Sequence, residues 1–295
     1  MKLKGDPIKI FWEKASCWRK LSLLRLLGKI KTDVAQKYLE EMRLLQNEDG
    51  GFVREKGEAS TVSVTAEAII NLIHSSEKPT SSVVKRAIAF LWSLQKENGS
   101  WRENPKLATN KIPFWSSTEK GVPILTADAI LALAGAGYKN NKQLLKAVDW
   151  LRSMQSKEGM WIYLEDTEPS DVDPDSTHKA LEALVKVNKA THSPCIARGC
   201  KALEKFILTE AAKWMKKWPV WSWIAPLDGL VAAGYDVNNE VVKYALSKIL
   251  EQQQENGGWP DGYEVRVVPT LITLGLISKE ETWRKISEIL RSKAT

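Results

Sequence analysis

Four copies of one short phrase punctuate this chain. They are Gln46-Asn-Glu-Asp-Gly-Gly-Phe52, Gln95-Lys-Glu-Asn-Gly-Ser-Trp101, Gln155-Ser-Lys-Glu-Gly-Met-Trp161 and Gln253-Gln-Glu-Asn-Gly-Gly-Trp259. Each copy reads Gln, then Gly four residues later, then an aromatic residue two positions further. Successive aromatic residues are 49, 60 and 98 residues apart, and the last interval is twice the first. A recurring phrase at this period indicates a repeat protein, in which each unit is too small to bury its own apolar face.

Two kinds of helix are expected between the phrases. Helices of the first kind carry charges on one face and mostly precede the Gln; we expect them at 34–45, 83–94, 143–154, 196–208, 241–252 and 282–290. Helices of the second kind are rich in Ala and Leu and nearly free of charge; we expect them at 63–73, 126–136, 177–187, 227–233 and 269–277. An N-terminal helix at 12–27 completes this second set of six. The second kind should be buried on most sides.

Six polar-faced helices alternating with six buried ones predict a closed double ring with a central cavity. We therefore expect residues 1–295 to form a single all-α domain, an (α/α)6 barrel. The Gly of each phrase should end an outer helix in a left-handed turn. The Gln and the aromatic residue are interpreted as scaffold that fastens this turn.

The bulk composition narrows the function. The net charge of +7 and the pI near 9.1 suit an anionic partner, such as a diphosphate or a phospholipid surface. Nucleic acid is disfavoured, because no helix-turn-helix or zinc-finger spacing is present. Three cysteines, no secretory leader and no apolar run of membrane-spanning length favour a reducing cytoplasmic location. Thirteen Trp residues exceed what the repeat needs.

The repeated phrase, placed ahead of Ala- and Leu-rich helices, resembles that of the class II terpene cyclases, which include the squalene and hopene cyclases. Protein prenyltransferase β-subunits share the barrel. Those enzymes hold zinc with an Asp, a Cys two residues later and a distant His. No cysteine here has an Asp two residues before it, so prenyl transfer and a metal site are disfavoured.

The resemblance continues in the segment Asp173-Pro-Asp175-Ser176-Thr177. The cyclases carry Asp-x-Asp-Asp-Thr at this place, so both carboxyls and the Thr match, while Ser176 replaces the last Asp. The middle carboxyl is the family's general acid, and the resemblance therefore assigns that role to Asp175. Asp173 and Thr177 complete the expected catalytic set.

The chemistry explains why carboxyls would cluster here. An alkene is a very weak base, so the acid that protonates it must be a neutral carboxyl. Burial and neighbouring negative charge both favour the neutral form, and Asp171, Asp173 and Asp175 provide that proximity. Ser176, Thr177 or His178 would hydrogen-bond the acid. The alternative is plain helix capping, for which Asp, Ser and Thr are the preferred residues.

Aromatic faces stabilise carbocations without trapping them. The candidates that lie near the cluster or in loops before inner helices are Trp115, Tyr163, Trp218, Trp221, Trp223 and Tyr263, with Phe114 as a weaker choice. For each of these, the alternative is ordinary core packing.

The expected substrate is a linear isoprenoid, and no cofactor is required. If the substrate carries a diphosphate, Arg54, Arg102, Lys111 and Lys120 are available to hold it, and Mg²⁺ would help. The basic stretch 8–29 is either the first inner helix or a peripheral membrane contact. A single barrel also needs its cavity closed by a homodimer, another partner, a membrane or the loop 101–121. The competing function is a non-catalytic barrel that binds a prenyl or lipid chain.

Overall fold

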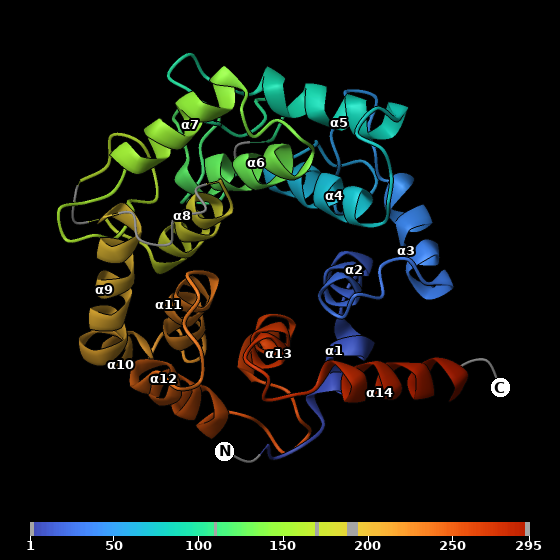
Figure 1. The fold of residues 1–295 in the computed structure, drawn as a ribbon, viewed down its shortest axis with the longest axis vertical. Helices are drawn as coiled ribbons and strands as arrows, with labels where there is room; N and C mark the ends of the chain where they lie inside the picture. The colour runs from blue at the N-terminus through green and yellow to red at the C-terminus, as the bar shows by residue number, and fades with distance from the viewer. Residues whose placement is uncertain (1–2, 109–110, 169–170, 188–193, 293–295) are drawn as a thin grey trace.

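The computed structural model describes residues 3–108, 111–168, 171–187 and 194–292, and their helices form two concentric rings (Figure 1). The outer ring comprises α3 (Asp33–Arg43), α5 (Ser82–Ser93), α7 (Lys142–Ser153), α9 (Pro194–Thr209), α12 (Glu240–Glu251) and α14 (Lys279–Ser292). The inner ring comprises α2 (Cys17–Leu26), α4 (Val62–His74), α6 (Pro123–Gly135), α8 (Pro174–Val187), α11 (Trp221–Ala232) and α13 (Glu264–Thr273). The predicted all-α (α/α)6 architecture is confirmed. The assignment of all 295 residues to one domain stays a prediction.

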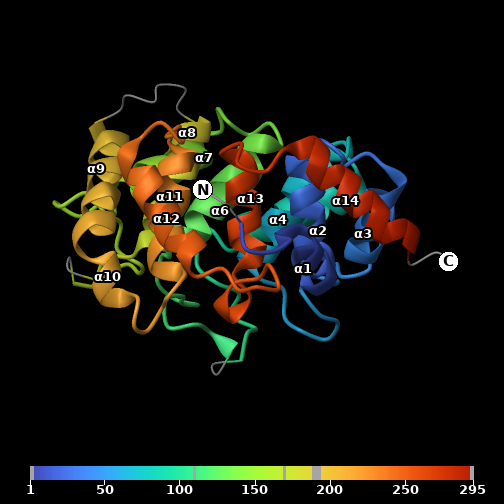
Figure 2. The same ribbon diagram turned by 90° about the horizontal axis from the view of Figure 1, so that it is seen from below.

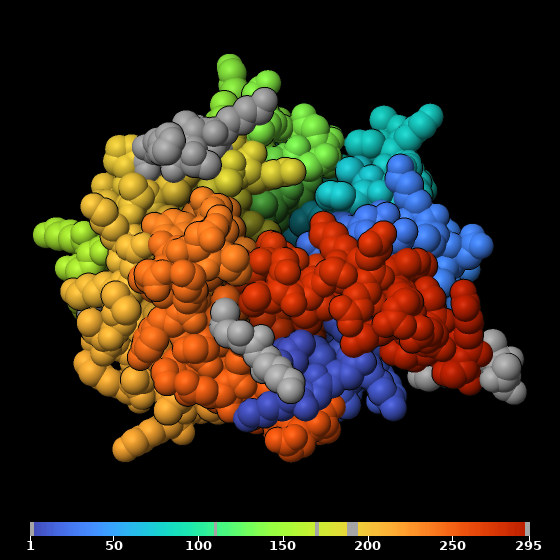
Figure 3. All heavy atoms as spheres, turned by 60° about the horizontal axis from the view of Figure 1, so that its bottom comes forward, coloured from blue at the N-terminus to red at the C-terminus, as the bar shows by residue number. Residues whose placement is uncertain are grey.

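The expectation of one N-terminal helix over 12–27 is wrong. The backbone is extended at Ala15 and Ser16, which separates α1 (Pro7–Lys14) from α2. Helix α1 packs against α13 and α14, so the first helix and the last two helices of the chain close the ring (Figure 3). Phe11 and Trp18 are fully buried or nearly so, so the apolar side chains of this stretch belong to the core. The interpretation of this stretch as the first inner helix is confirmed for α2.

Two inner helices begin earlier than expected. Helix α11 starts at Trp221 rather than Leu227, and α13 starts at Glu264 rather than Pro269. Both helices contain an internal proline, Pro226 and Pro269. A proline costs one backbone hydrogen bond, and burial of the helix within the ring outweighs that cost. The structure also contains a short helix, α10 (Ala211–Trp214), and a 3₁₀ turn, η2 (Pro260–Gly262).

The repeated phrase is scaffold, as expected. In the third copy, the Gln155 side chain donates to the carbonyl of Gly159 at 2.8 Å and to that of Cys195 at 2.8 Å. It thereby ties the end of α7 to the start of the next outer helix. The indole of Trp161 donates back to the Leu151 carbonyl at 2.6 Å, and Gly159 has a φ of +104°. The other copies repeat the Gln–Gly bond and the positive φ.

A buried threonine links each of the first three turns to the following inner helix. The backbone N–H groups of Phe52, Trp101 and Trp161 donate to the hydroxyls of Thr65, Thr126 and Thr177 at 2.8, 2.9 and 2.9 Å. In the fourth turn, Trp259 donates instead to the Glu264 carboxylate at 3.2 Å. The inner helices are therefore held in one common register relative to their turns.

The long connections that lead into the inner helices gather on one face of the double ring (Figure 2). They include the described parts of the segment between Trp101 and Gly121 and the loops before α4 and α13. We call this side the loop face. Among the described residues, no helix is both long enough and apolar enough to cross a membrane.

Candidate active site

A cavity of about 1700 Å³ runs between the inner helices and the loops that precede them. Pockets for small ligands typically measure about 300–1000 Å³, so this one has room for a large molecule. Its lining combines many aromatic residues with nine acidic and six basic ones. The cavity therefore carries a set of charged groups in addition to its apolar surface.

The lining divides into two regions. The first, which we call the aromatic region, consists of Phe114, Trp115, Tyr163, Phe206, Trp214, Trp218, Trp221 and Tyr263. The second, which we call the polar column, follows the inner helices and includes Arg54 from the loop before α4. It consists of Arg19, Ser22, Arg25, Arg54, Ser63, Glu67, Asp128, Asp175, His178, Lys179, Glu182, Asp228, Arg266 and Thr270. Asp173, directly before α8, and Asp175, in the first turn of α8, both line this cavity.

The polar column follows from helical periodicity. On α4, Ser63 and Glu67 are four residues apart, and on α8, Asp175, Lys179 and Glu182 recur every three or four residues. Side chains at these spacings share one helix face. The sequence contains a signal for this column, because several of the nearly charge-free inner helices keep an isolated charge at such a position.

Most charges of the column are paired, either within α8 or between neighbouring elements. Arg54 meets Glu67 at 3.0 Å, and Lys179 lies 2.9 Å from Glu182 and 3.6 Å from Asp128. Despite burial, the neighbouring Lys179 ammonium lowers the pKa of Glu182 to about 2. These contacts show that the column contains ionised groups.

Asp175 is held as a carboxylate. Its two oxygens lie 2.6 Å from the Arg266 guanidinium and 2.6 Å from the Trp221 indole nitrogen, which donates to it. Burial alone would raise the pKa of Asp175, but Arg266 and these hydrogen bonds outweigh it and lower that pKa below its ordinary value. Arg266 also bonds Asp228 at 2.5 Å, and Asp228 accepts from the Thr270 hydroxyl at 2.6 Å.

Asp173 has the opposite tendency. Burial, followed by the negative charge of Asp175, raises the pKa of Asp173 above its ordinary value. Its carboxyl accepts the backbone N–H of Ser176 at 2.7 Å and so caps α8, as the capping alternative predicted. The surroundings therefore favour the neutral form at Asp173 more than at Asp175, because Arg266 stabilises the charge on Asp175 and that charge opposes a second one on Asp173. The resemblance assigned the proton to Asp175, and the charges around the pair favour Asp173 instead.

Ser176 and Thr177 point away from the cavity lining. Both are fully buried, and the Thr177 hydroxyl is occupied by the Trp161 N–H and the Asp173 carbonyl, to which it donates at 2.8 Å. The structure therefore gives Thr177 a scaffold contact that it shares with Thr65 and Thr126. The Thr177 hydroxyl makes no hydrogen bond to the carboxyl pair among the described residues, whereas the Ser176 hydroxyl lies close enough to the Asp173 carboxyl to counteract part of the rise in its pKa.

His178 and Asp171 both line the cavity, and only His178 makes polar contacts within the column. His178 Nδ1 lies 3.3 Å from an Arg266 nitrogen and Nε2 lies 3.7 Å from Glu182. Because a guanidinium only donates, Nδ1 accepts, and the neutral ring carries its hydrogen on Nε2. Burial, reinforced by Lys179, lowers the pKa of His178 and favours that neutral form.

Five of the six aromatic candidates line the cavity, namely Trp115, Tyr163, Trp218, Trp221 and Tyr263. Trp223 does not, and that expectation is wrong. Trp223 is 1% exposed and packs edge-on against Tyr244 of α12, with 5.8 Å between the ring centroids. A residue two positions after Trp221 lies on a different face of the helix, and Trp223 therefore faces away from the cavity. The sequence analysis missed Phe206 and Trp214, whose position depends on the packing of α9 and α10 against the site.

The basic residues proposed for a diphosphate are not gathered. Arg54 lines the cavity but is paired with Glu67, Lys111 pairs with Glu58 at 3.5 Å, and Arg102 and Lys120 are absent from the lining. Within the described parts of the chain, no three His, Cys, Asp or Glu side chains could hold a metal ion. The described residues therefore give no support to Mg²⁺, which was considered only for a diphosphate substrate.

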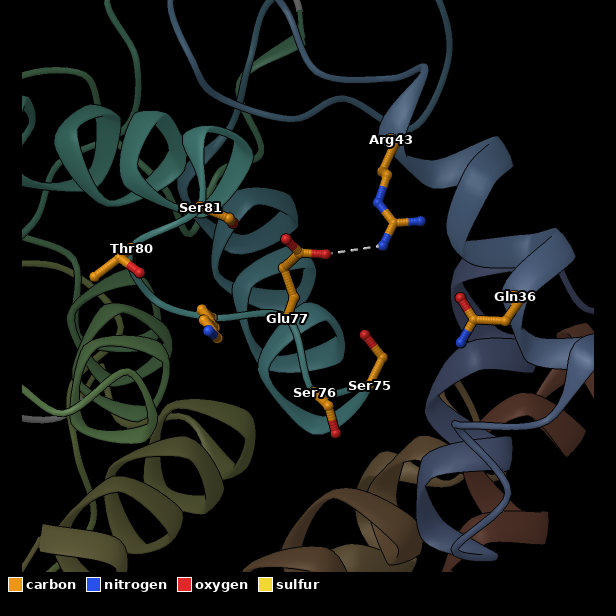
Figure 4. Close-up of a pocket in the computed structure, with 8 residues that line it drawn as sticks. Gln36, Arg43, Ser75, Ser76, Glu77, Thr80 and Ser81 are labelled. Carbon is orange, nitrogen blue, oxygen red and sulfur yellow. Dashed lines mark hydrogen bonds and ion pairs between the residues drawn. The ribbon is translucent and has the colours of Figure 1, made fainter.

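A second pocket of about 440 Å³ lies between α3 and the α4–α5 connection (Figure 4). Its lining is polar, and the Arg43–Glu77 ion pair at 3.1 Å crosses it. None of the residues singled out from the sequence lies there.

Comparison with known proteins identifies a family. A family model described as "Squalene-hopene cyclase C-terminal domain" matches residues 16–170. Lanosterol synthase erg7A of Aspergillus fumigatus is 31% identical over 136 residues, which is 45% of this chain and 17% of that protein. Squalene–hopene cyclase of Zymomonas mobilis is 24% identical over 143 residues, 48% of this chain and 22% of that one. The chain thus spans less than a quarter of the length of either relative.

Solved structures support the same fold. The type II terpene cyclase MstE from Scytonema aligns with a TM-score of 0.61 at 18% identity, over 82% of this chain and 70% of that one. An ent-copalyl diphosphate synthase from Streptomyces platensis aligns with a TM-score of 0.59 at 14% identity, over 88% of this chain and 50% of that one. At these identities the likeness is one of architecture.

Proposed function

The chain belongs to the squalene-hopene cyclase C-terminal domain family, and on that premise we propose that it is a class II terpene cyclase. It starts the cyclisation of a linear isoprenoid by protonating a C=C bond. Asp173 supplies the proton, and Asp175 remains a carboxylate beside it. MstE, of the same architecture, has been solved with a geranylgeranyl-bearing substrate, which supports an isoprenoid here.

One observation carries this proposal: of two neighbouring carboxyls in the cavity, Asp175 contacts Arg266 and Trp221, whereas Asp173 has no cationic partner among the described residues. Arg266 and Trp221 fix the charge on Asp175, and that charge, together with burial, keeps the proton on Asp173. Paired titratable groups whose environments push their pKa values apart are typical of acid–base sites. Simple helix capping requires neither the second carboxyl nor its ion pair.

The proposed reaction conserves atoms and charge. The Asp173 proton moves to one carbon of a terminal C=C bond, which leaves a carbocation on the other carbon and a carboxylate on Asp173. Internal C=C bonds then attack in turn, each forming one C–C bond and moving the positive charge along the chain. Loss of a proton to a base ends the cascade. Asp173 then recovers its proton from solvent, because two adjacent carboxylates repel.

The aromatic region fits the charged intermediates. Trp218 and Trp221 pack together at 6.4 Å, and Tyr163 packs edge-on with Phe114 at 6.0 Å. Each ring face stabilises a nearby cation by about 0.5–2 kcal/mol. No step of this proposal uses Mg²⁺.

Incubation with linear isoprenoids of several chain lengths, followed by analysis for cyclic products, tests the proposal. Asp173→Asn should lower turnover by about 10²–10⁴-fold, the usual contribution of a general acid. Asp175→Asn should also lower turnover, because loss of its charge lets Asp173 ionise, and the high-pH limb of the rate profile should move to lower pH. Asp149→Asn, at a 77% exposed position on α7, is the matched control. Full activity in Asp173→Asn, or no cyclic product from any substrate, would refute the proposal.

A second function is favoured by the polar column. Ionised carboxylates such as Glu182 lie in the same cavity, and a carboxylate is a nucleophile that traps carbocations. A barrel that binds an isoprenoid or lipid chain without reacting would tolerate these charges. Saturable binding of an isoprenoid that is recovered unchanged after long incubation would favour this second function.

A further inference from the structure

Two arginines of α2 stand apart from the other charges of the polar column. Arg19 and Arg25 both line the cavity, and neither forms an ion pair or a hydrogen bond with any residue that the structure describes. The Arg25 Nη1 atom is completely buried and has no partner. Arg19 exposes its side chain on the cavity side of the same helix.

The other cations of the column have acidic partners. Arg54 pairs with Glu67, Lys179 pairs with Asp128 and Glu182, and Arg266 pairs with Asp175 and Asp228. The α8–α11–α13 side of the column therefore carries more negative than positive charge. The α2–α4 side has three arginines against the single carboxylate of Glu67.

Unpaired buried charge is costly. Desolvation lowers the pKa of both arginines, but only Arg25 has a buried nitrogen without a partner, and Arg19 is exposed to the cavity. A buried donor without an acceptor costs about 1–3 kcal/mol, and more when it is charged. Glu67 is close enough to act on both arginines electrostatically, but it is already bonded to Arg54 and to Ser22 at 2.9 Å. An anion that enters from the cavity would supply the missing acceptors.

We propose that Arg19 and Arg25 bind the anionic head group of an amphiphilic isoprenoid, a phosphate or carboxylate, at the α2 side of the polar column. The chain of the same molecule then extends into the aromatic region, past Asp173. Six residues on one helix separate the two arginines by about 9 Å along its axis, with Ser22 between them. This head-group site defines the substrate class of the proposed cyclase. It rests on the proposed function only for the claim that the bound isoprenoid chain is cyclised.

Head-group binding can be measured without turnover. Calorimetric titrations would compare geranylgeranyl diphosphate, geranylgeranoic acid and geranylgeraniol, with inorganic pyrophosphate as the head group alone. The acids should bind the protein at least tenfold more tightly than the alcohol, since charge-assisted hydrogen bonds contribute more than neutral ones. Whichever of the two acidic ligands binds more tightly, the diphosphate or the carboxylic acid, identifies the head group.

Arg19→Gln and Arg25→Gln should each remove most of that tenfold preference while binding of the alcohol stays the same. Arg291→Gln on the exposed end of α14 removes the same charge far from the cavity and should keep the preference. Neither cavity variant should lower the unfolding temperature, because neither breaks an ion pair, so loss of binding cannot be ascribed to unfolding. Equal affinity for acid and alcohol, or a preference that persists in both cavity variants, would overturn the inference.

The outcome is separable from that of the proposed reaction. The same titrations in Asp173→Asn should give an unchanged preference for the acids, since that residue does not contact the head group. If the preference is present and depends on the arginines, yet no cyclic product forms, the head-group site stands and the cyclase proposal fails.

Discussion

The third repeat unit differs from the first two at two positions that the common scaffold aligns. Each unit places a buried threonine on its inner helix, and the residues four and two positions before that threonine can be compared directly. They are Thr61 and Ser63 in the first unit, Val122 and Ile124 in the second, and Asp173 and Asp175 in the third. Only the third of these units brings two carboxyls to the cavity at these two positions.

The comparison separates capping from chemistry. Thr61 caps α4 by accepting the Val64 N–H at 3.3 Å, as Asp173 caps α8 by accepting the Ser176 N–H. A hydroxyl is therefore sufficient at this position of the fold. The carboxyl of Asp173 and its partner Asp175 are additions to the scaffold, which is the pattern expected when one copy of a repeat acquires a site.

Asp173→Thr copies the first unit into the third and is expected to have the largest effect. Thr keeps a capping oxygen, so the free energy of unfolding should fall by no more than about 1 kcal/mol. Turnover should drop by about 10²–10⁴-fold, because the hydroxyl cannot act as the acid. Steady-state rates and denaturant unfolding, both also measured on Asp173→Asn, would check this. Retained turnover would show that the difference between the units is not catalytic.

A carboxyl with a raised pKa also contacts the inner helix of the first unit, which sharpens the comparison. Glu103 comes from the second unit and accepts the Val62 N–H of α4 at 3.0 Å, but it is 5% exposed and does not line the cavity. Burial raises the pKa of Glu103 to about 7. The folded protein then holds a proton that the unfolded chain releases near pH 4.5, so this contribution to stability is full below pH 4.5 and is lost as the pH rises to 7.

Glu103→Gln should remove that loss, which amounts to about 3 kcal/mol, and leave a flatter dependence of stability on pH. The free energy of unfolding, measured from pH 4.5 to 8, should show the difference between the variant and the original protein. Glu97→Gln at an exposed position is the control and should keep the original slope. An unchanged slope in Glu103→Gln would mean that Glu103 is ionised in the folded protein.

The features of the fold that repeat along the chain could be predicted from the sequence. The phrase built around Gln46, and its copies, predicted the alternation of helices, the left-handed glycine turns and the closed ring. The break at Ala15 and the early starts of α11 and α13 escaped it, because tertiary burial decides whether a helix tolerates a proline or ends at a serine.

Only the part of the site formed by residues close in sequence could be predicted. Asp173 and Asp175 were found because they are neighbours in the chain, and their ionisation was not, because it depends on Arg266 from ninety residues away. Likewise Arg19 and Arg25 looked like the polar face of a basic helix. Their isolation from acidic partners becomes visible only when the ring closes around them.

The buried threonine that accepts a backbone N–H recurs in three repeat units, and Thr177 is its copy beside the carboxyl pair. Replacing Thr65, Thr126 or Thr177 by Val keeps the shape of the side chain and leaves one buried backbone N–H without an acceptor. Each substitution should therefore lower the free energy of unfolding by a similar amount, about 1–3 kcal/mol. Denaturant unfolding of the three variants gives these values side by side.

Turnover per folded molecule then distinguishes scaffold from chemistry. Since the Thr177 hydroxyl is fully used by Trp161 and the Asp173 carbonyl, Thr177→Val should lose no more activity than Thr126→Val once both are corrected for the folded fraction. A loss of turnover in Thr177→Val alone would show that this hydroxyl acts on the carboxyl pair. It would also restore Thr177 to the catalytic set that the resemblance to the cyclases assigned to it.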